Sequence, residues 1–349
     1  MKAATVEKFG GVQDIVVRED VPRPRLKPGS KQLLVRVMAC SLSPSDYRTL
    51  SGDCRFAKNP VRFPYIPGGD ICGEVLEKGD GLSDTEVQVG DNVISTWTMF
   101  GQGGLAEFAL VDSALSIRKP DSLSALEAAA FANTCPYAYL AVKGAQLKEG
   151  DRVLILGGSG GMGTLLIQLA KNFGASFVAC TTTDTALGMS LGADRVINYR
   201  QTNWWEEKEF IENPFDVVFD AAEGLTAWHN IKSSKVLKPA SKGGRFIAIV
   251  LNEWHIEIRS FGQLVSFLFR PLWRSFASKF NKKQPRYHVH LDSPDKTSME
   301  ESLALVLEGK LKIVVDKRSP HPFTTEGVRE AFQLHMDRSG HGKIVVSLQ

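Results

Sequence analysis

The pattern of apolar and polar positions is most regular in the middle of the chain. Residues 153–156 form a short apolar run, which is typical of a strand buried on both faces. A burst of glycine follows at 157–163, where five of the seven residues are Gly. Apolar side chains then recur at helical spacing up to Gly174, a typical helix-ending glycine: Leu165, Leu166, Leu169 and Phe173. The pattern predicts a strand, a glycine-rich turn and a helix in succession.

On either side of this unit the pattern changes. The first 120 residues carry strand-like runs, such as Leu33 to Val37 and Val93 to Thr96, interrupted by Gly and Pro. Ser124 and Glu127 form a capping box ahead of an Ala-rich helix. Further strands are expected at 177–181, 195–198, 216–220, 245–250 and 287–291, then a helix at 299–307 and a last strand at 343–348. Alternating strands and helices predict an α/β fold with a parallel, doubly wound sheet.

The glycines of the turn have the G-x-G-x-x-G spacing of dinucleotide-binding sites, at Gly158, Gly160 and Gly163. In that motif the first glycine turns the chain, the second lets the backbone approach a pyrophosphate, and the third lets the helix press against the strand. The helix then directs its free N–H groups at the phosphates. An ordinary Gly-rich turn is the alternative, but both flanking elements suit a cofactor site. The predicted contacts are Gly158, Ser159, Gly160, Gly161, Met162 and Gly163.

Composition narrows the function classes. A chain of 349 residues with 43% apolar and 23% charged residues is typical of a globular protein of about two domains. The formal charge of +3 is too small to indicate a nucleic-acid partner. The five cysteines are scattered, so neither a disulfide framework nor a cysteine zinc cluster is indicated. With no targeting segment or membrane-spanning run apparent, we expect a cytoplasmic location.

Seven motifs in register carry a family resemblance across nearly the whole chain. They lie at 39–53, 63–75, 90–93, 103–111, 157–163, 191–199, and at 309–317 with 342–348. Their order and spacing resemble the medium-chain dehydrogenase/reductase superfamily, in its zinc-independent, quinone-oxidoreductase-like branch. The resemblance implies a GroES-like β-rich catalytic domain at 1–124 and 293–349. It also implies a Rossmann NADP-binding domain with a doubly wound parallel sheet at 125–292, and an active site in the cleft between the two.

The resemblance also bears on metal. Zinc-dependent members place Cys, His and Cys at positions that align with Ser43, Gly69 and Asn133, none of which offers a thiolate or an imidazole. We therefore expect no metal. Polarisation of a carbonyl would then depend on hydroxyl, amide and backbone donors. Such donors suit quinones and enones better than simple alcohols, because conjugation already spreads the developing negative charge.

Three catalytic candidates follow from the resemblance: Tyr47, Ser43 and Asn133. Tyr47 is the best placed to donate to a substrate oxygen or to supply a proton, although a mere wall of the cleft is an equal alternative. Ser43 stands where quinone oxidoreductases usually have Asn. Neighbouring Asp46 is interpreted as a turn-former. Tyr137 replaces a small Thr beside the nicotinamide pocket, which it would narrow.

For the cofactor we expect NADPH rather than NADH. The end of the second Rossmann strand lacks the carboxylate that binds ribose hydroxyls, and it offers Thr181 and Thr182 instead. Tyr199 matches a tyrosine that relatives place near the 2′-phosphate, and either Arg200 or Lys343 is the cation expected to add charge there. Ala221 and Val250, at the ends of later strands, complete the predicted contacts.

Other conspicuous residues receive structural interpretations. We expect Trp204 and Trp205 to pack as anchors of a surface helix, and the charges of Asp220 and Glu223 to face water. Each of the seven histidines is interpreted as a surface or core residue, because no metal-binding or nucleophilic spacing connects them.

These inferences predict an NADPH-dependent, metal-free reductase of quinones or α,β-unsaturated carbonyls. An enoyl-thioester reductase is one alternative, although such enzymes carry a catalytic Tyr where this chain has Cys54. A cofactor-binding interaction protein without useful turnover is the other. The resemblance does not choose between a monomer and a homodimer.

The segment 258–291 is the longest without a carboxylate, and it carries seven basic residues. An apolar stripe repeats at helical spacing through Leu264, Leu268, Leu272, Phe276 and Phe280, with Val265, Phe269, Trp273 and Ala277 beside it. Pro271 is expected to bend or divide this helix. The favoured interpretation has the stripe packing over the substrate cleft or against a second subunit. A peripheral contact with an anionic membrane is the alternative.

Overall fold

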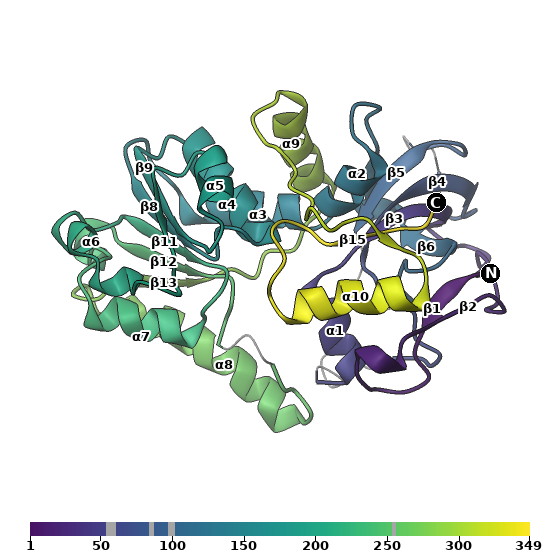
Figure 1. Ribbon diagram of the computed structural model, residues 1–349, viewed down its shortest axis with the longest axis horizontal. Helices are drawn as coiled ribbons and strands as arrows, with labels where there is room; N and C mark the ends of the chain where they lie inside the picture. Colours follow the sequence, from purple (N-terminus) through teal and green to yellow (C-terminus); the bar gives the residue numbers. More distant parts are fainter. Residues whose placement is uncertain (54–60, 84–86, 97–101, 253–255) are drawn as a thin grey trace.

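The computed structural model describes residues 1–53, 61–83, 87–96, 102–252 and 256–349. Two lobes built on separate sheets lie side by side, and both chain ends belong to the β-rich lobe (Figure 1). The other lobe is a parallel sheet covered by helices on both faces (Figure 1). The α/β fold class predicted from the sequence is confirmed.

The β-rich lobe is organised around β3 (Gln32–Ser41), a long and mostly buried strand. It pairs antiparallel with β4 (Asp70–Lys78), β6 (Phe108–Asp112) and β15 (Val345–Ser347). The sheet continues through β5 (Asn92–Thr96) and β7 (Ser116–Arg118) on one side and β14 (His321–Pro322) on the other. A two-stranded sheet of β1 (Ala3–Thr5) and β2 (Val16–Arg18) and the helices α1 (Pro44–Ser51) and α10 (Thr325–Met336) complete this lobe.

The second sheet has the strand order β10-β9-β8-β11-β12-β13, all parallel. Its strands are β8 (Arg152–Leu156), β9 (Phe177–Thr181), β10 (Arg195–Ile197), β11 (Val217–Asp220), β12 (Arg245–Ala248) and β13 (Arg286–Val289). The order reverses between β8 and β11, so the Rossmann topology opens a crevice at the carboxyl ends of these two strands. The glycine turn leaves β8 at that point.

Helices connect these strands and cover the sheet (Figure 1). They are α3 (Thr134–Ala145), α4 (Gly161–Asn172), α5 (Thr185–Ser190), α6 (Lys208–Glu212), α7 (Leu225–Ser233) and α8 (Phe261–Ser278), followed by α9 (Lys296–Leu307). α4 is the helix predicted after the glycine turn, and Gly174 just beyond it has the expected left-handed φ of 89°. The predicted strand, turn and helix are thus all present.

Helix α2 (Ala125–Phe131) joins the two lobes. Its predicted capping box is confirmed, since the Ser124 N–H donates to the Glu127 carboxylate at 3.0 Å and the Glu127 N–H donates to Ser124 Oγ at 3.2 Å. The helix packs on the β-rich sheet, where the Ser41 hydroxyl donates to the Ala129 carbonyl at 2.8 Å. One apolar core runs from this contact into the Rossmann sheet. The domain boundary at 124/125 stays a prediction.

Candidate active-site cleft

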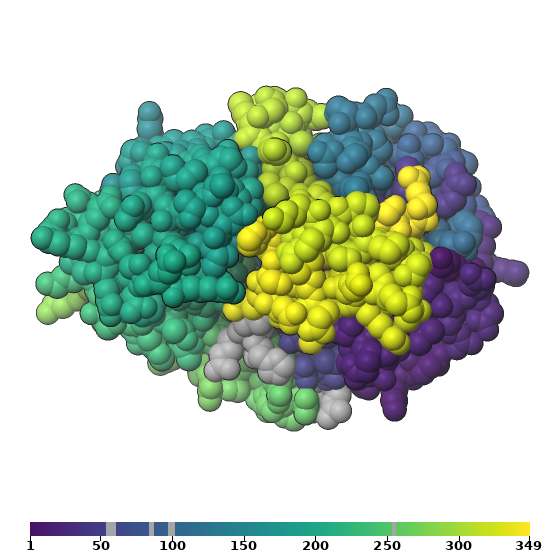
Figure 2. All heavy atoms as spheres, in the orientation of Figure 1, coloured from purple at the N-terminus to yellow at the C-terminus, as the bar shows by residue number. Residues whose placement is uncertain are grey.

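A cleft of about 1080 Å³ lies between the lobes. This volume exceeds the range of roughly 300 to 1,000 Å³ usual for drug-sized ligands, so it has room for a dinucleotide and an acceptor together. The surface is hollowed where the teal atoms of the Rossmann lobe meet the yellow C-terminal segment (Figure 2). Most of the residues predicted from the sequence line the cleft: Ser43, Asn133, Ser159, Gly160, Gly161, Met162, Gly163, Thr181, Tyr199, Ala221, Val250 and Lys343.

The remaining three predicted residues, Tyr47, Gly158 and Thr182, are not among those that line it. Tyr47 is 8% exposed and packs in the apolar core of the β-rich lobe. Thr182 is buried, and its hydroxyl accepts from the Asp184 N–H at 3.0 Å.

The glycine turn is built by backbone contacts. The Gly157 N–H donates to Thr181 Oγ1 at 3.0 Å, and the Gly158 N–H donates to the Thr181 carbonyl at 2.8 Å. The tight turn falls on Gly157, with a φ of 87°, rather than on Gly158 as predicted from the motif. Position 158 instead requires glycine because a Cβ there would lie 2.7 Å from the Cβ of Cys180. A Cβ on Gly163 would lie 2.0 Å from the Gly157 carbonyl oxygen, so only glycine lets α4 approach the strand.

Helix α4 begins at this turn without a side-chain cap on its first N–H groups. Its N-terminal residues line the cleft, so their N–H groups and the positive end of the helix dipole suit a phosphate group. Gly160 leaves open space, since a Cβ there would meet only the Gly157 oxygen at 3.6 Å. The residues present therefore fit the pyrophosphate of a dinucleotide.

At one end of the cleft, Tyr199 and Arg200 follow strand β10. Tyr199 is 48% exposed, and within the described part of the chain no carboxylate pairs with Arg200. The nearest carboxylate in sequence after β9, Asp184, caps helix α5 and lies 3.0 Å from His341 Nδ1. The carboxylate of Asp184 therefore interacts with a histidine and with the N-terminus of a helix.

Asp220 ends strand β11, directly before the cleft-lining residues Ala221 and Ala222. The prediction that its charge faces water is wrong: the side chain is fully buried and accepts from the N–H groups of Ala222, Glu223 and Gly224 at 2.6 to 3.0 Å. Burial raises the pKa of Asp220 to about 7, against the effect of these donors. Asp220 therefore shapes the loop that presents Ala221 to the cleft.

Glu223 in the same loop accepts from the indole N–H of Trp204 at 3.0 Å. Burial raises the pKa of Glu223, so it too departs from the expected water-facing position. Trp204 is fully buried against the sheet, as its packing interpretation requires, and its neighbour Trp205 meets it edge to face. Both tryptophans also line the cleft.

The opposite end of the cleft contains a buried polar network. Lys343 Nζ donates to the Leu42 carbonyl at 2.8 Å and lies 3.4 Å from Asp70 Oδ2. Thr96 Oγ1 lies 3.3 Å from Asp70 Oδ1, and the Asn133 amide donates to Thr96 at 2.9 Å. Burial raises the pKa of Asp70 to about 6 despite the neighbouring ammonium group. The Lys343 ammonium group is therefore bound at the Ser43 end of the cleft, which leaves Arg200 as the candidate cation next to Tyr199.

Ser43 precedes helix α1 at this network. Its N–H donates to Asp46 Oδ2 at 2.7 Å, its hydroxyl lies 3.1 Å from the same oxygen, and Asp46 Oδ1 accepts from the Gly68 N–H at 3.1 Å. Asp46 is thus the turn-former expected. The Ser43 hydroxyl also lies 2.7 Å from that of Ser45, which lines the cleft as well. Two neighbouring hydroxyl groups thus line this end of the cleft.

Tyr137 covers the network from helix α3. Its ring lies 4.3 Å from that of His290, whose Nε2 is 3.1 Å from the Tyr137 carbonyl oxygen and whose Nδ1 is 3.3 Å from Asp292. Burial raises the pKa of Tyr137 to about 12 and lowers that of His290, which Asp292 opposes. Both rings line the cleft, and the narrowing of the nicotinamide pocket by Tyr137 stays a prediction.

Several cleft residues were missed in the sequence: Arg48, Gly157, His290, His335 and Arg338. His335 Nε2 is buried without a hydrogen-bond partner in the described part of the chain, and burial lowers the pKa of His335 to about 3, helped by Lys343 and Arg48. A lone histidine in a helix gives no signal of such a position. Gly157 was missed because the motif spacing assigns the tight turn to its neighbour.

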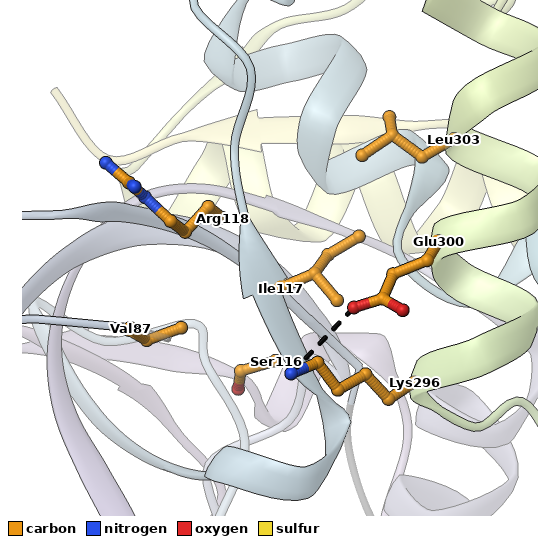
Figure 3. Close-up of a pocket in the computed structure, with 7 residues that line it drawn as sticks. All are labelled: Val87, Ser116, Ile117, Arg118, Lys296, Glu300 and Leu303. Atoms are coloured by element: carbon orange, nitrogen blue, oxygen red, sulfur yellow. Dashed lines mark ion pairs between the residues drawn. The ribbon is translucent and has the colours of Figure 1, made fainter. Parts of the chain in front are cut away.

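A smaller cavity of about 190 Å³ lies between β7 and α9. Figure 3 shows Lys296 and Glu300 extending from α9 toward β7 and pairing with each other, with a nitrogen–oxygen distance of 3.8 Å. None of the predicted site residues lines this cavity. It has no part in the site described above.

The residues present do not fit a catalytic zinc. Ser43, Gly69 and Asn133 all line the cleft, as the alignment with zinc ligands requires, but Ser43 offers only a hydroxyl, Asn133 only an amide and Gly69 no side chain at all. No group of three or more His, Cys, Asp or Glu side chains that could hold a metal occurs within the described ranges. Cys54, on which the enoyl-thioester comparison depends, lies outside them.

Comparisons with known proteins agree with this arrangement. A family model described as an alcohol dehydrogenase GroES-like domain matches residues 29–121, and one described as a zinc-binding dehydrogenase matches 191–346. A 2-methylene-furan-3-one reductase of Solanum lycopersicum is 30% identical over 99% of this chain and 79% of its own. The chain belongs to the medium-chain dehydrogenase/reductase superfamily. It lies in the quinone-oxidoreductase-like branch and is an oxidoreductase.

Two further relatives support this placement. An NADPH-dependent alkenal/one oxidoreductase of Arabidopsis thaliana, named as chloroplastic, is 30% identical over 99% of this chain and 79% of its own. The solved structure of a quinone oxidoreductase from Coxiella burnetii has a TM-score of 0.78 and 27% identity, and covers 100% of this chain and 99% of its own.

Proposed function

We propose that this oxidoreductase is an NADPH-dependent, metal-free reductase of quinones or α,β-unsaturated carbonyls. The observation that carries the proposal is the cleft itself. A dinucleotide-binding turn lines one part of it, and hydroxyl and amide groups replace zinc ligands in another. The names of the two plant relatives and of the Coxiella protein support the same substrate class.

In this proposal the cofactor end binds and orients. The N–H groups at the start of α4 hold the pyrophosphate, while Arg200 and Tyr199 bind the 2′-phosphate. Ala221 and Val250 line the path of the nicotinamide half. A reduced nicotinamide supplies the hydride. The protein contributes position and the exclusion of water, and Tyr137 closes the site on one side.

At the acceptor end, Ser43, Ser45 and Asn133 donate hydrogen bonds to the acceptor oxygen. Asp46 fixes the serine pair, and Thr96 fixes the Asn133 amide. Tyr47 has no part in this assignment, because it packs outside the cleft lining. The donors are neutral, so they suit an acceptor whose charge is already spread by conjugation.

One assay tests the proposal against its alternatives. NADPH absorbance is followed with a small quinone, an enone and an enoyl thioester. We expect turnover of the first two. Turnover of only the enoyl thioester would favour the rival enzyme, and cofactor binding without turnover of any acceptor would favour an interaction protein.

Coenzyme and metal are tested separately. We expect kcat/KM to be higher with NADPH than with NADH, and equal values would reject the preference. Treatment with a strong chelator should leave turnover unchanged. Stoichiometric bound zinc, or activity restored only by zinc, would reject the metal-free mechanism. The cytoplasmic location is likewise a proposal, tested by microscopy of the tagged protein.

A further inference from the structure

Helix α8 has two distinct faces. Leu264, Phe267, Pro271, Arg274 and Ser278 recur at helical spacing on the inner face, where Pro271 and Ser278 are buried. The Ser278 hydroxyl accepts from the N–H of Tyr287 in β13 at 3.1 Å, and Phe267 lines the active-site cleft. The inner face thus attaches the helix to the Rossmann sheet and forms part of the cleft wall.

Pro271 does not divide the helix, which is continuous from Phe261 to Ser278, and the expected bend stays a prediction. Proline removes the N–H that would donate to the carbonyl of Phe267, and the side-chain amide of Asn252 donates there instead, at 3.2 Å. The Asn252 oxygen in turn accepts from Arg274. These contacts hold an 18-residue helix as one continuous platform.

The outer face carries the apolar stripe. It does not pack over the cleft, which was one half of the favoured interpretation, because nearly all of its large side chains are exposed. The other half, packing against a second subunit, stays a prediction. Phe269 is 59% exposed, Trp273 55% and Phe280 75%. The others are Phe261, Val265, Leu268, Leu272 and Phe276. A row of exposed aromatic and aliphatic side chains of this length marks an interaction surface.

The charged residues of this segment indicate what kind of partner the outer face binds. No Asp or Glu occurs from Ile258 to Leu291. Arg270, Lys279, Lys282 and Lys283 are exposed, and no carboxylate within the described ranges pairs with them. Two copies of this chain joined symmetrically through α8 would bring the basic groups together, at an electrostatic cost. An anionic surface instead attracts the basic groups and accepts the apolar stripe.

The helix is also positioned to act on the cleft. It runs along the lower side of the Rossmann lobe toward the β-rich lobe (Figure 1). Just before it, the Ile258 N–H donates to the Asp53 carbonyl at 2.5 Å, and Arg259 pairs with the Asp53 carboxylate at 2.8 Å. The segment therefore bridges the two lobes beside the cleft, with Phe267 on the cleft side.

We propose that the outer face of α8 docks the protein on an anionic membrane surface. The Phe and Trp side chains enter the interface, and the basic residues lie against the lipid headgroups. No helix in the described ranges is long and apolar enough to cross a bilayer, so the contact is peripheral. Docking brings the cleft beside lipophilic acceptors dissolved in the membrane, a consequence that rests on the proposed function.

Sedimentation with vesicles tests the docking without reference to activity. At low salt we expect the protein to bind vesicles made of equal parts of phosphatidylcholine and phosphatidylserine. It should dissociate from them at high salt, and it should not bind vesicles of phosphatidylcholine alone. Trp273→Ala should weaken binding several-fold. Replacing Lys279, Lys282 and Lys283 together by Gln should weaken it on the order of 100-fold, at about five-fold for each basic group.

Matched controls lie elsewhere on the surface. Leu307→Ala removes an exposed apolar side chain from α9, and a triple Lys8, Lys27 and Lys31 to Gln variant removes the same charge from the β-rich lobe. Both should bind vesicles as the unchanged protein does. No binding at low salt would overturn the proposal. So would a stable dimer in solution that Trp273→Ala separates, because a second copy would then cover the stripe.

Turnover is measured in a second arm. The Trp273→Ala variant should lose activity with a long-chain quinone held in anionic vesicles and keep it with a small soluble quinone. Equal losses on both quinones would overturn the link between docking and acceptor supply. If no quinone or enone is reduced while vesicle binding persists, the proposed function fails and the docking stands.

Discussion

At the glycine turn the protein presents backbone N–H groups from one continuous stretch, whereas the Ser43 end of the cleft is assembled from side chains of distant segments. The backbone N–H groups come from residues 157–163. The side-chain network at the other end comes from Ser43, Asp70, Asn133 and Lys343. A backbone site has no room for an added Cβ where two stretches of backbone meet closely, as at Gly163. A side-chain network tolerates backbone shifts but not the loss of one charge. The two ends should therefore fail in different ways when they are mutated.

The largest effect is expected at the glycine turn. In Gly163→Val, the new Cβ would lie 2.0 Å from the Gly157 carbonyl oxygen, so α4 cannot approach the strand. We expect loss of the folded protein or of all NADPH binding, measured by thermal unfolding and cofactor titration. Gly160→Ala is the matched variant, because only one atom, at 3.6 Å, faces its Cβ. It should fold normally and bind NADPH on the order of 10-fold more weakly. Normal binding by Gly163→Val would contradict the comparison.

The second prediction concerns Asp70. Burial raises its pKa to about 6, above the ordinary value of 3.8. A carboxyl that holds its proton more tightly in the folded state stabilises the fold below about pH 4, and this contribution is lost as pH rises through about 6. The loss is at most about 3 kcal/mol. Asp70→Asn should remove it, so the difference in unfolding free energy between the two proteins should change between pH 4 and pH 7. A constant difference would reject the shift.

A third prediction separates the cofactor's phosphates. Arg200→Gln should lower kcat/KM for NADPH by roughly 10-fold and leave NADH nearly unchanged, because only NADPH carries the 2′-phosphate. Tyr199→Phe should act in the same direction with a smaller effect. Lys208→Gln, which removes an exposed charge on α6, is the control. Equal losses with both coenzymes would place Arg200 outside the phosphate site.

The smallest effect is expected at Tyr137. Tyr137→Thr removes a ring that lines the cleft. If that ring limits the acceptor's size, the variant should raise kcat/KM for a bulky quinone, relative to a small one, by roughly three- to ten-fold. Tyr137→Phe keeps the ring and removes only a weak hydrogen bond of 3.4 Å to the His290 carbonyl, so it should behave as the unchanged protein. If the phenylalanine variant instead loses activity with all acceptors, the hydroxyl rather than the ring is what matters.

The contrast between the two ends also explains what the sequence could reveal. Strand, turn and helix follow one another along the chain, so spacing alone located the cofactor end. The motif still placed the tight turn one residue too late. Gly157 and Gly158 are both glycine, so residue type does not show which of the two has the positive φ. The Asp70 network depends on the pairing of β3, β4 and β15, and no local pattern reports which buried charges then meet.

Helix α8 illustrates a second limit. Its periodicity correctly predicted an apolar stripe, but periodicity does not say whether the stripe faces the core or the exterior. The effect of Pro271 was also out of reach, because the missing donor is supplied by Asn252 from another segment. The stripe is exposed because the inner face of the helix is the one that packs on the Rossmann lobe. Which of the two faces packs inward is visible only in the fold.

Strand β15 has a consequence for how the protein is made. Val345 to Ser347 pair with β3 in the interior of the sheet, and the Lys343 ammonium group reaches the Leu42 carbonyl just ahead of them. During synthesis the Rossmann lobe emerges as one uninterrupted piece and can fold while the ribosome is still working. The β-rich lobe must wait for residues 343–347, and the Ala39–Ser41 part of β3 lacks one of its two partner strands until then. A chain that stalls late in translation would therefore carry a folded nucleotide-binding half and an unpaired strand open to chaperones and to aggregation.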